Sequence, residues 1–73
     1  MLKKLSGHEV IKALSKVGFV AKRQRGSHVM LIKETKEGKV GCTVPLHNEL
    51  KIGTLKRILK QAKVSEEEFE KFL

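Results

Sequence analysis

The spacing of the apolar residues changes twice along this 73-residue chain, and this change limits its fold more than any other feature. Apolar residues recur at helical spacing between residues 10 and 17 and again between residues 55 and 62. The segment between them, residues 19–44, is typical of strands. A chain of this length has room for about one hydrophobic core. We therefore expect a single domain over residues 1–73, with helices and strands packed together as an α+β fold.

The first helix is predicted over residues 7–17. Ser6 and Glu9 form a capping box, in which each side chain binds the backbone N–H of the other residue, and Gly18 is a typical helix stop. The second helix is predicted from a Thr54 cap to about Lys63, and its apolar stripe consists of Leu55, Ile58, Leu59 and Ala62.

A short helical turn is predicted at the C-terminal end of the sequence. Ser65, with acidic residues at the next three positions, repeats the capping pattern. We expect this turn to place Phe69, Phe72 and Leu73 against the rest of the domain.

Three strands are predicted between the first two helices, over residues 19–25, 28–34 and 39–44. Gly26 and Ser27 suit a two-residue hairpin turn with Gly at the position of positive φ, and residues 35–38 form a second turn. Pro45 ends the last strand. The economical arrangement is a three-stranded antiparallel sheet with both helices on one face. This α-β-β-β-α order is that of the double-stranded-RNA-binding domain.

Positive charge is the strongest feature of the composition. The chain has sixteen Lys and Arg against eight Glu, and residues 1–65 alone carry a net charge of +11. Such an excess indicates a polyanion, an acidic protein partner, or both. A surface that is charged only for solubility is the alternative.

Cys42 is the single cysteine, which excludes an internal disulfide and favours a reducing compartment. The sequence has neither the apolar run of a signal peptide nor one long enough to cross a bilayer. We expect a cytoplasmic protein that does not associate with membranes.

His28 is the candidate for acid–base chemistry. It follows the tight turn that sets it beside the end of the first strand, where Arg23 and Arg25 lie. Because RNA carries its own nucleophile, the 2′-hydroxyl, an imidazole near neutrality and guanidinium groups for phosphate charge form a minimal cleavage site. The spacing alone leaves open a hairpin histidine without a chemical role.

Lys56, Arg57 and Lys60 lie on the polar side of the second predicted helix, where they suit contacts with RNA phosphates. A solvated helix face is the alternative. The chain has no Trp or Tyr, so stacking on single-stranded bases is disfavoured and sequence preference should be weak.

Other chemistries fit the sequence poorly. The chain has no Asp, and its histidines and cysteine lack metal-ligand spacing, so we expect no metal and no other cofactor. The glycine spacing of a phosphate-binding Walker loop is absent, and Ser27 has no acidic partner for a hydrolase triad.

The sequence resembles the HicA toxin family nearly from end to end. The most specific parts are the Gly-Ser-His turn of residues 26–28 and the Leu-Lys-x-Gly-Thr-Leu segment of residues 50–55. The other matching segments are Leu5–Gly7, Gly18–Phe19, Arg23–Arg25, Val44–His47, Ile58–Leu59 and Ser65–Phe69. The chain departs from the family at Ile52, where proline is common, which alters a helix start and no chemical group.

The resemblance implies a toxin that cleaves mRNA without the ribosome and is neutralised by a HicB antitoxin covering its active site. It also assigns the catalytic role to the histidine of the Gly-Ser-His turn, His28. Ser27 and His47 are secondary candidates, since His47 precedes the second helix and could contact RNA or transfer a second proton. His8, in the first turn of a helix, is the weakest histidine candidate.

Three rival functions remain. They are a non-catalytic RNA-binding module of the same fold, a DNA-associated regulator and a basic subunit that binds only an acidic partner. The DNA-associated reading is disfavoured because no helix-turn-helix fits between Gly18 and Val44.

The run Val29–Ile32 has two interpretations. Met30 and Ile32 either remain exposed on the open sheet face, where an inhibitor or second subunit could bind, or are covered by neighbouring side chains.

Overall fold

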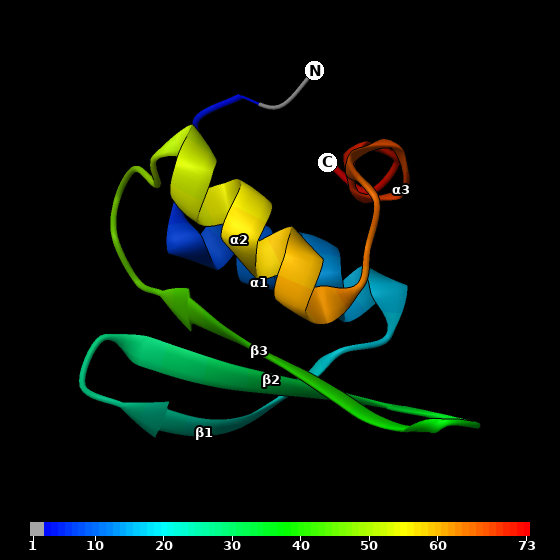
Figure 1. Cartoon of the computed structure of the whole chain (residues 1–73). Helices are drawn as coiled ribbons and strands as arrows, with labels where there is room; N and C mark the ends of the chain where they lie inside the picture. The colour runs from blue at the N-terminus through cyan, green and yellow to red at the C-terminus, as the bar shows by residue number, and fades with distance from the viewer. Residues whose placement is uncertain (1–2) are drawn as a thin grey trace.

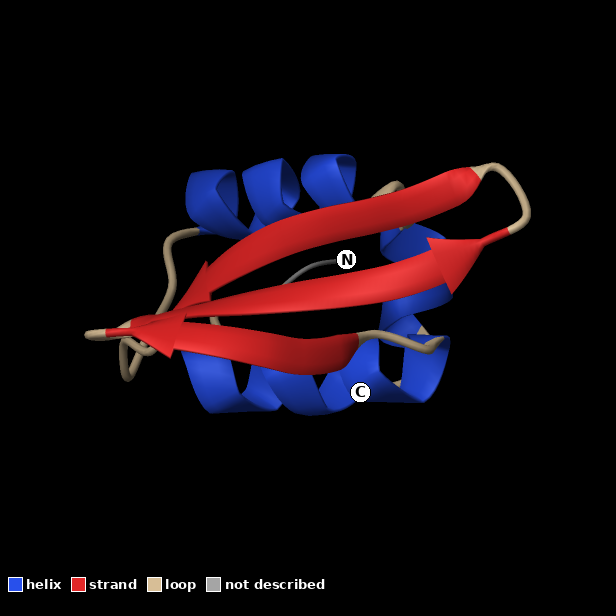
Figure 2. Ribbon diagram, turned by 90° about the horizontal axis from the view of Figure 1, so that it is seen from below, coloured by secondary structure: helices blue, strands red, loops and turns tan. Residues whose placement is uncertain are grey.

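The computed structural model describes residues 3–73 and contains a three-stranded antiparallel sheet and three helices (Figure 1). The sheet has the order β1-β2-β3. Figure 2 views the sheet from its open side, with the helices all behind it. The elements are α1 (Gly7–Val17), β1 (Val20–Arg25), β2 (His28–Thr35), β3 (Gly38–Pro45), α2 (Ile52–Ala62) and α3 (Glu66–Glu70). The expected α+β fold, with both main helices on one face, is confirmed.

The core lies between the helices and one face of the sheet. Residues that alternate along β2 and β3 are buried there, as Leu31 and Val44 illustrate, whereas Met30 on the opposite face is 42% exposed. Side chains from every helix join this core, and the largest fully buried ones are Val10, Leu14, Leu31, Val44, Leu50, Leu55 and Phe69. One sheet face is therefore packed and the other is open. Within residues 3–73, no helix is long and apolar enough to span a membrane.

The capping box of α1 is present as predicted. The backbone N–H of Glu9 donates to the Ser6 hydroxyl at 3.1 Å, and the Ser6 N–H donates to the Glu9 carboxylate at 2.9 Å. These bonds satisfy donors that a helix N-terminus otherwise leaves unpaired. They also lower the pKa of Glu9.

The predicted Thr54 cap of α2 is wrong, because the helix already begins at Ile52 and its N-cap lies three residues before Thr54. Lys51 is the N-cap residue, and its side chain makes no capping hydrogen bond. Its carbonyl closes the first turn by accepting from the Leu55 N–H at 3.0 Å. Leu50 is fully buried and Ile52 is half-buried, so packing directs the chain into the helix before a hydroxyl cap is reached. Such burial outweighs a side-chain cap, which contributes about 1 kcal/mol.

The C-terminal turn is confirmed in part. The Ser65 hydroxyl accepts from the Glu68 N–H at 3.1 Å, and Phe69 is fully buried. Phe72 is half-buried, but Leu73 is 48% exposed, so the prediction that it packs against the body is wrong. The reason is that α3 ends at Glu70, and the residues beyond it no longer follow the buried side of the helix.

The segment after β3 joins the N-terminus of α1 at very short range. The Gly7 N–H donates to the His47 carbonyl at 2.9 Å, and the Leu50 N–H donates to the Leu5 carbonyl at 2.7 Å. A Cβ atom on Gly7 would collide with the Pro45 carbonyl oxygen and lie 3.0 Å from the Leu46 Cα. Only glycine allows this approach, since both obstacles belong to the backbone.

We predict that Gly7→Ala lowers the free energy of unfolding by about 1–3 kcal/mol, because the added methyl forces α1 away from β3. Gly53→Ala is the matched control. Gly53 also lies in a first helical turn, but a Cβ there meets nothing within 4 Å, so this change should raise stability by up to about 1 kcal/mol. Urea denaturation measures both, and equal stability of Gly7→Ala and wild type would contradict the close approach.

Candidate functional site

The turn between β1 and β2 positions His28. Gly26 has a φ of 60° and Ser27 is not in the positive-φ region, which agrees with the predicted two-residue turn with Gly at the position of positive φ. The Gln24 side chain donates to the Gly26 carbonyl at 3.1 Å, and the Leu46 N–H donates to the Ser27 carbonyl at 2.6 Å. Hydrogen bonds from two sides thus fix the turn, and His28 follows as the first residue of β2.

Strand pairing brings the predicted arginines to His28. Arg25 pairs with His28 and Arg23 with Met30 across β1 and β2, while Met30 pairs with Thr43 across β2 and β3. These five side chains line one shallow hollow of about 160 Å³ on the open sheet face. We refer to it as the His28 hollow. Its lining includes two guanidinium groups and no carboxylate, so it suits an anion.

Strand alternation sets the direction of the two arginines, because Arg23 and Arg25 lie two residues apart and pair in one unbroken register with Met30 and His28. The pairing of β1 with β2 shifts between Ala21 and Arg23, which leaves Lys22 as the extra residue. Beyond the bulge, Val20 pairs with Ile32 and shares the open face with Arg23. Without the extra residue, Val20 and Arg23 would lie on opposite faces of the sheet.

Thr43 is the lining residue that sequence reasoning missed. The alternation of β3 did contain a signal, because Cys42 and Val44 are buried and Thr43 must therefore face the other side. Its position opposite Met30 depends on the register between β2 and β3, which no local pattern reveals. The sequence left open whether Met30 and Ile32 are exposed or covered on the open face, and Met30 is 42% exposed there. Ile32 is half-buried.

The secondary candidates lie near the turn but outside the lining of the hollow. Ser27 is exposed within the turn itself. His47 is exposed two residues after Pro45, which pairs with His28, and its carbonyl accepts the Gly7 N–H. His8 is exposed on α1.

The three cations of α2 are not brought to His28. Lys56, Arg57 and Lys60 are exposed on a helix that packs on β3 from the closed side of the sheet. The predicted RNA-contacting residues therefore form two separate groups, one around the His28 hollow and one on the helical layer.

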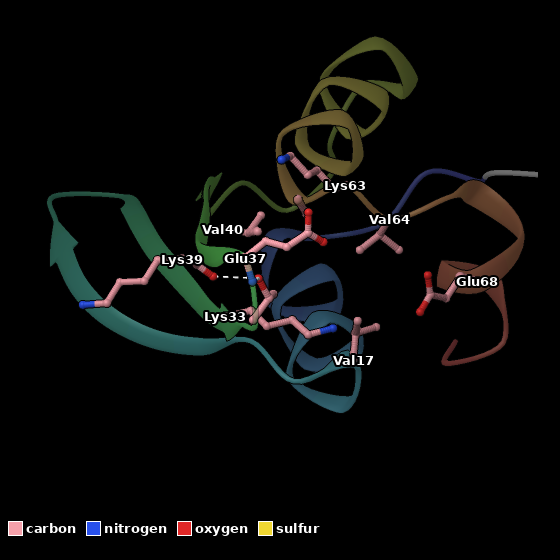
Figure 3. A pocket seen from close by; sticks show the side chains of 11 residues that line it. Val17, Lys33, Glu37, Lys39, Val40, Lys63, Val64 and Glu68 are labelled. Carbon is pink, nitrogen blue, oxygen red and sulfur yellow. Dashed lines mark hydrogen bonds between the residues drawn. The ribbon is translucent and has the colours of Figure 1, made fainter.

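A second hollow, of about 210 Å³, lies near the turn between β2 and β3, at the other end of the sheet (Figure 3). Lys33, Lys39 and Lys63 line it together with Glu37 and Glu68. Its charges are of both signs, and it contains neither histidine nor cysteine. It therefore lacks the cationic and acid–base character of the His28 hollow. Among residues 3–73, no group of three or more His, Cys or Glu side chains has the geometry of a metal site.

Cys42 faces the core from β3 and is 4% exposed. Burial raises the pKa of its thiol to about 11, because the charged thiolate is poorly solvated there. Its side chain points away from the open face, so it takes no part in the His28 hollow.

Comparison with known proteins gives one family. Residues 7–64 match the family model described as the HicA toxin of bacterial toxin-antitoxin. The matched segment contains the three strands and the His28 hollow and ends before α3. No curated protein sequence matches the chain.

We predict that Cys42 in the folded protein reacts with a thiol reagent such as Ellman's reagent at pH 8 at least about a hundredfold more slowly than in denaturant. A rise of about two pH units in the pKa lowers the thiolate fraction by about that factor, and burial adds to it. The measurement is the absorbance time course with and without guanidinium chloride. Comparable rates in both conditions would show that β3 does not hold Cys42 in the core.

Proposed function

This chain belongs to the HicA toxin family, and on that premise we propose that it is a metal-independent endoribonuclease that cleaves mRNA without the ribosome. Family membership makes it the toxin of a toxin–antitoxin system, with a HicB antitoxin as its partner. We place its action in the cytoplasm, where its mRNA substrate is found.

The single observation that supports this proposal is the composition of the His28 hollow. An exposed imidazole lies on the same face as two arginines from the neighbouring strand, without a carboxylate in the lining. Imidazole transfers protons in both directions near neutral pH. Guanidinium groups bind phosphate oxygens through paired N–H donors. The two requirements of RNA cleavage are therefore available in one place.

In the proposed reaction the RNA 2′-oxygen attacks the adjacent phosphorus. His28 takes the proton from the 2′-hydroxyl as the new P–O2′ bond forms, and the P–O5′ bond breaks. Arg23 and Arg25 stabilise the extra negative charge on the phosphate in the transition state. The departing 5′-oxygen takes a proton from water or from His47. The products are a 2′,3′-cyclic phosphate and a 5′-hydroxyl end.

Binding and cleavage would then use different groups of cations. The arginines of the hollow act on the reacting phosphate, whereas Lys56, Arg57 and Lys60 on α2 contact phosphates elsewhere along the RNA. A net charge of +8 supports binding through the RNA backbone, which makes affinity sensitive to salt because bound phosphates release counterions. Contacts of this kind carry little base specificity.

We predict that His28→Ala lowers the rate of RNA cleavage by about 10²–10⁴-fold, the usual contribution of a proton-transfer group. The fold should persist because His28 is exposed. The assay uses a long mRNA in excess EDTA, with end analysis for the cyclic phosphate. His8→Ala is the matched control, since it removes an exposed histidine that does not line the hollow, and it should cleave at the wild-type rate.

Three results would contradict this prediction. Near wild-type cleavage by folded His28→Ala would exclude His28 as the proton-transfer group and make His47 the leading candidate. Activity that vanished in EDTA and returned with Mg²⁺ or Zn²⁺ would refute metal independence. RNA binding without any cleavage by the wild type would favour the non-catalytic module.

A second prediction separates the two groups of cations. Arg23→Ala with Arg25→Ala should lower cleavage at saturating RNA by at least about 10²-fold. Lys56→Ala with Lys60→Ala should weaken RNA binding and flatten its salt dependence while the saturated rate changes little. Both double variants remove two charges. If they changed RNA affinity equally and also changed the saturated cleavage rate equally, the division of roles would be contradicted.

A further inference from the structure

The two outer strands of the sheet differ in how their free edges are protected. β1 carries Lys22, Arg23 and Arg25 and contains the bulge, which are devices that discourage another strand from pairing. β3 has no charged residue from Val40 to Pro45 and pairs regularly with β2 along its whole length. Figure 2 shows both outer strands without a further strand beside either, within the described residues.

The backbone of β3 presents hydrogen-bonding groups at this edge. The Leu46 N–H donates to the Ser27 carbonyl, so the alternate residues of β3, Cys42 and Val44 among them, bond to β2. The N–H and C=O groups of the residues between them, Gly41 and Thr43, therefore point away from β2 toward the free edge. These two residues offer two donors and two acceptors to an added strand.

The space beside this edge is open. Gly41, Cys42 and Thr43 line a hollow together with Met30 on the open face and Gln61 on α2. Gly41 has no side chain to fill it, and a Cβ there would lie 3.1 Å from the Ile32 Cδ1. Met30 and Thr43 also line the His28 hollow, so the two hollows adjoin.

We propose that the free edge of β3 at Gly41–Thr43 is a docking site at which an extended segment of the antitoxin adds to the sheet as a fourth strand. Main-chain hydrogen bonds give such strand addition its affinity. Because Thr43 also lines the His28 hollow, a segment bound here would cover the β3 side of that hollow. The proposal rests on the family's antitoxin partner and is independent of the chemistry assigned to His28.

Charge favours an acidic partner over a second copy of this chain. Pairing of two β3 edges would bring together two proteins that each carry +8. Helical spacing also places Arg57 one turn before Gln61, on the flank of α2 beside this edge, so self-pairing would oppose two arginines. The negative charge of an acidic segment would instead be attracted to this positive surface.

Amide hydrogen exchange on the wild-type protein tests the placement. In the free toxin the Gly41 and Thr43 amide protons should exchange rapidly, and in the complex with the HicB antitoxin they should be protected at least about tenfold. Equal exchange of these two protons in the free and bound toxin would overturn the proposal. Protection already present in the toxin alone, rising with its concentration, would assign the edge to a second copy and overturn it as well.

Substitution at Gly41 supplies the matched pair. Gly41→Pro removes the outward N–H and leaves the bonds to β2, whereas Gly41→Ala adds a Cβ and keeps that donor. The proline variant should bind the antitoxin about tenfold or more weakly than the alanine variant, because the segment's acceptor is left unpaired. Equal affinities of folded variants would overturn the proposal. RNA cleavage by both variants should match the wild type, so a failure of the cleavage proposal appears separately.

Discussion

The short connection after β3 is the constraint on which the site depends. In the space of five residues, Leu46 binds the turn that precedes His28, the His47 carbonyl binds the start of α1, and Leu50 binds Leu5. These backbone bonds tie one end of the sheet to the N-termini of both main helices. An exposed two-residue hairpin turn is ordinarily free to move. Here it is held from the β3 side, so the residue that follows it has a fixed place on the open face.

The element order could be predicted from the sequence because each element carries its own local signals. The capping residues of α1, the Gly-Ser turn and the alternation of β3 all act within a few residues of the structure that they determine. The start of α2 could not be found in this way, since Thr54 is a better cap than Lys51. A clue lay in the family resemblance of the sequence, which implies proline at position 52, a residue that suits the first position of a helix. Ile52 occupies that first position.

The sequence alone could predict only those residues of the site that lie close together along the chain. Arg25 and His28 flank one tight turn, so their pairing follows from its length. Arg23 joins them by strand alternation, since it lies two residues before Arg25, whereas Thr43 joins them through the register of a second strand pair. That register depends on long-range packing. The separation of the α2 cations from His28 has the same origin, since it follows from which face of the sheet the helix covers.

The two ends of the sheet show why a hairpin turn and nearby cations are not enough to make a site. At the distal end, Glu37 and Glu68 offset Lys33, Lys39 and Lys63, and the lining has no histidine. At the His28 end, neighbouring charges have one sign and an imidazole lies among them. That end also adjoins the unprotected edge of β3, so substrate and antitoxin would meet the toxin on connected surfaces. A partner that binds by backbone hydrogen bonds needs no contact with the histidine to hinder a polyanion from reaching it. Catalysis and its control can therefore depend on different atoms of the same small face.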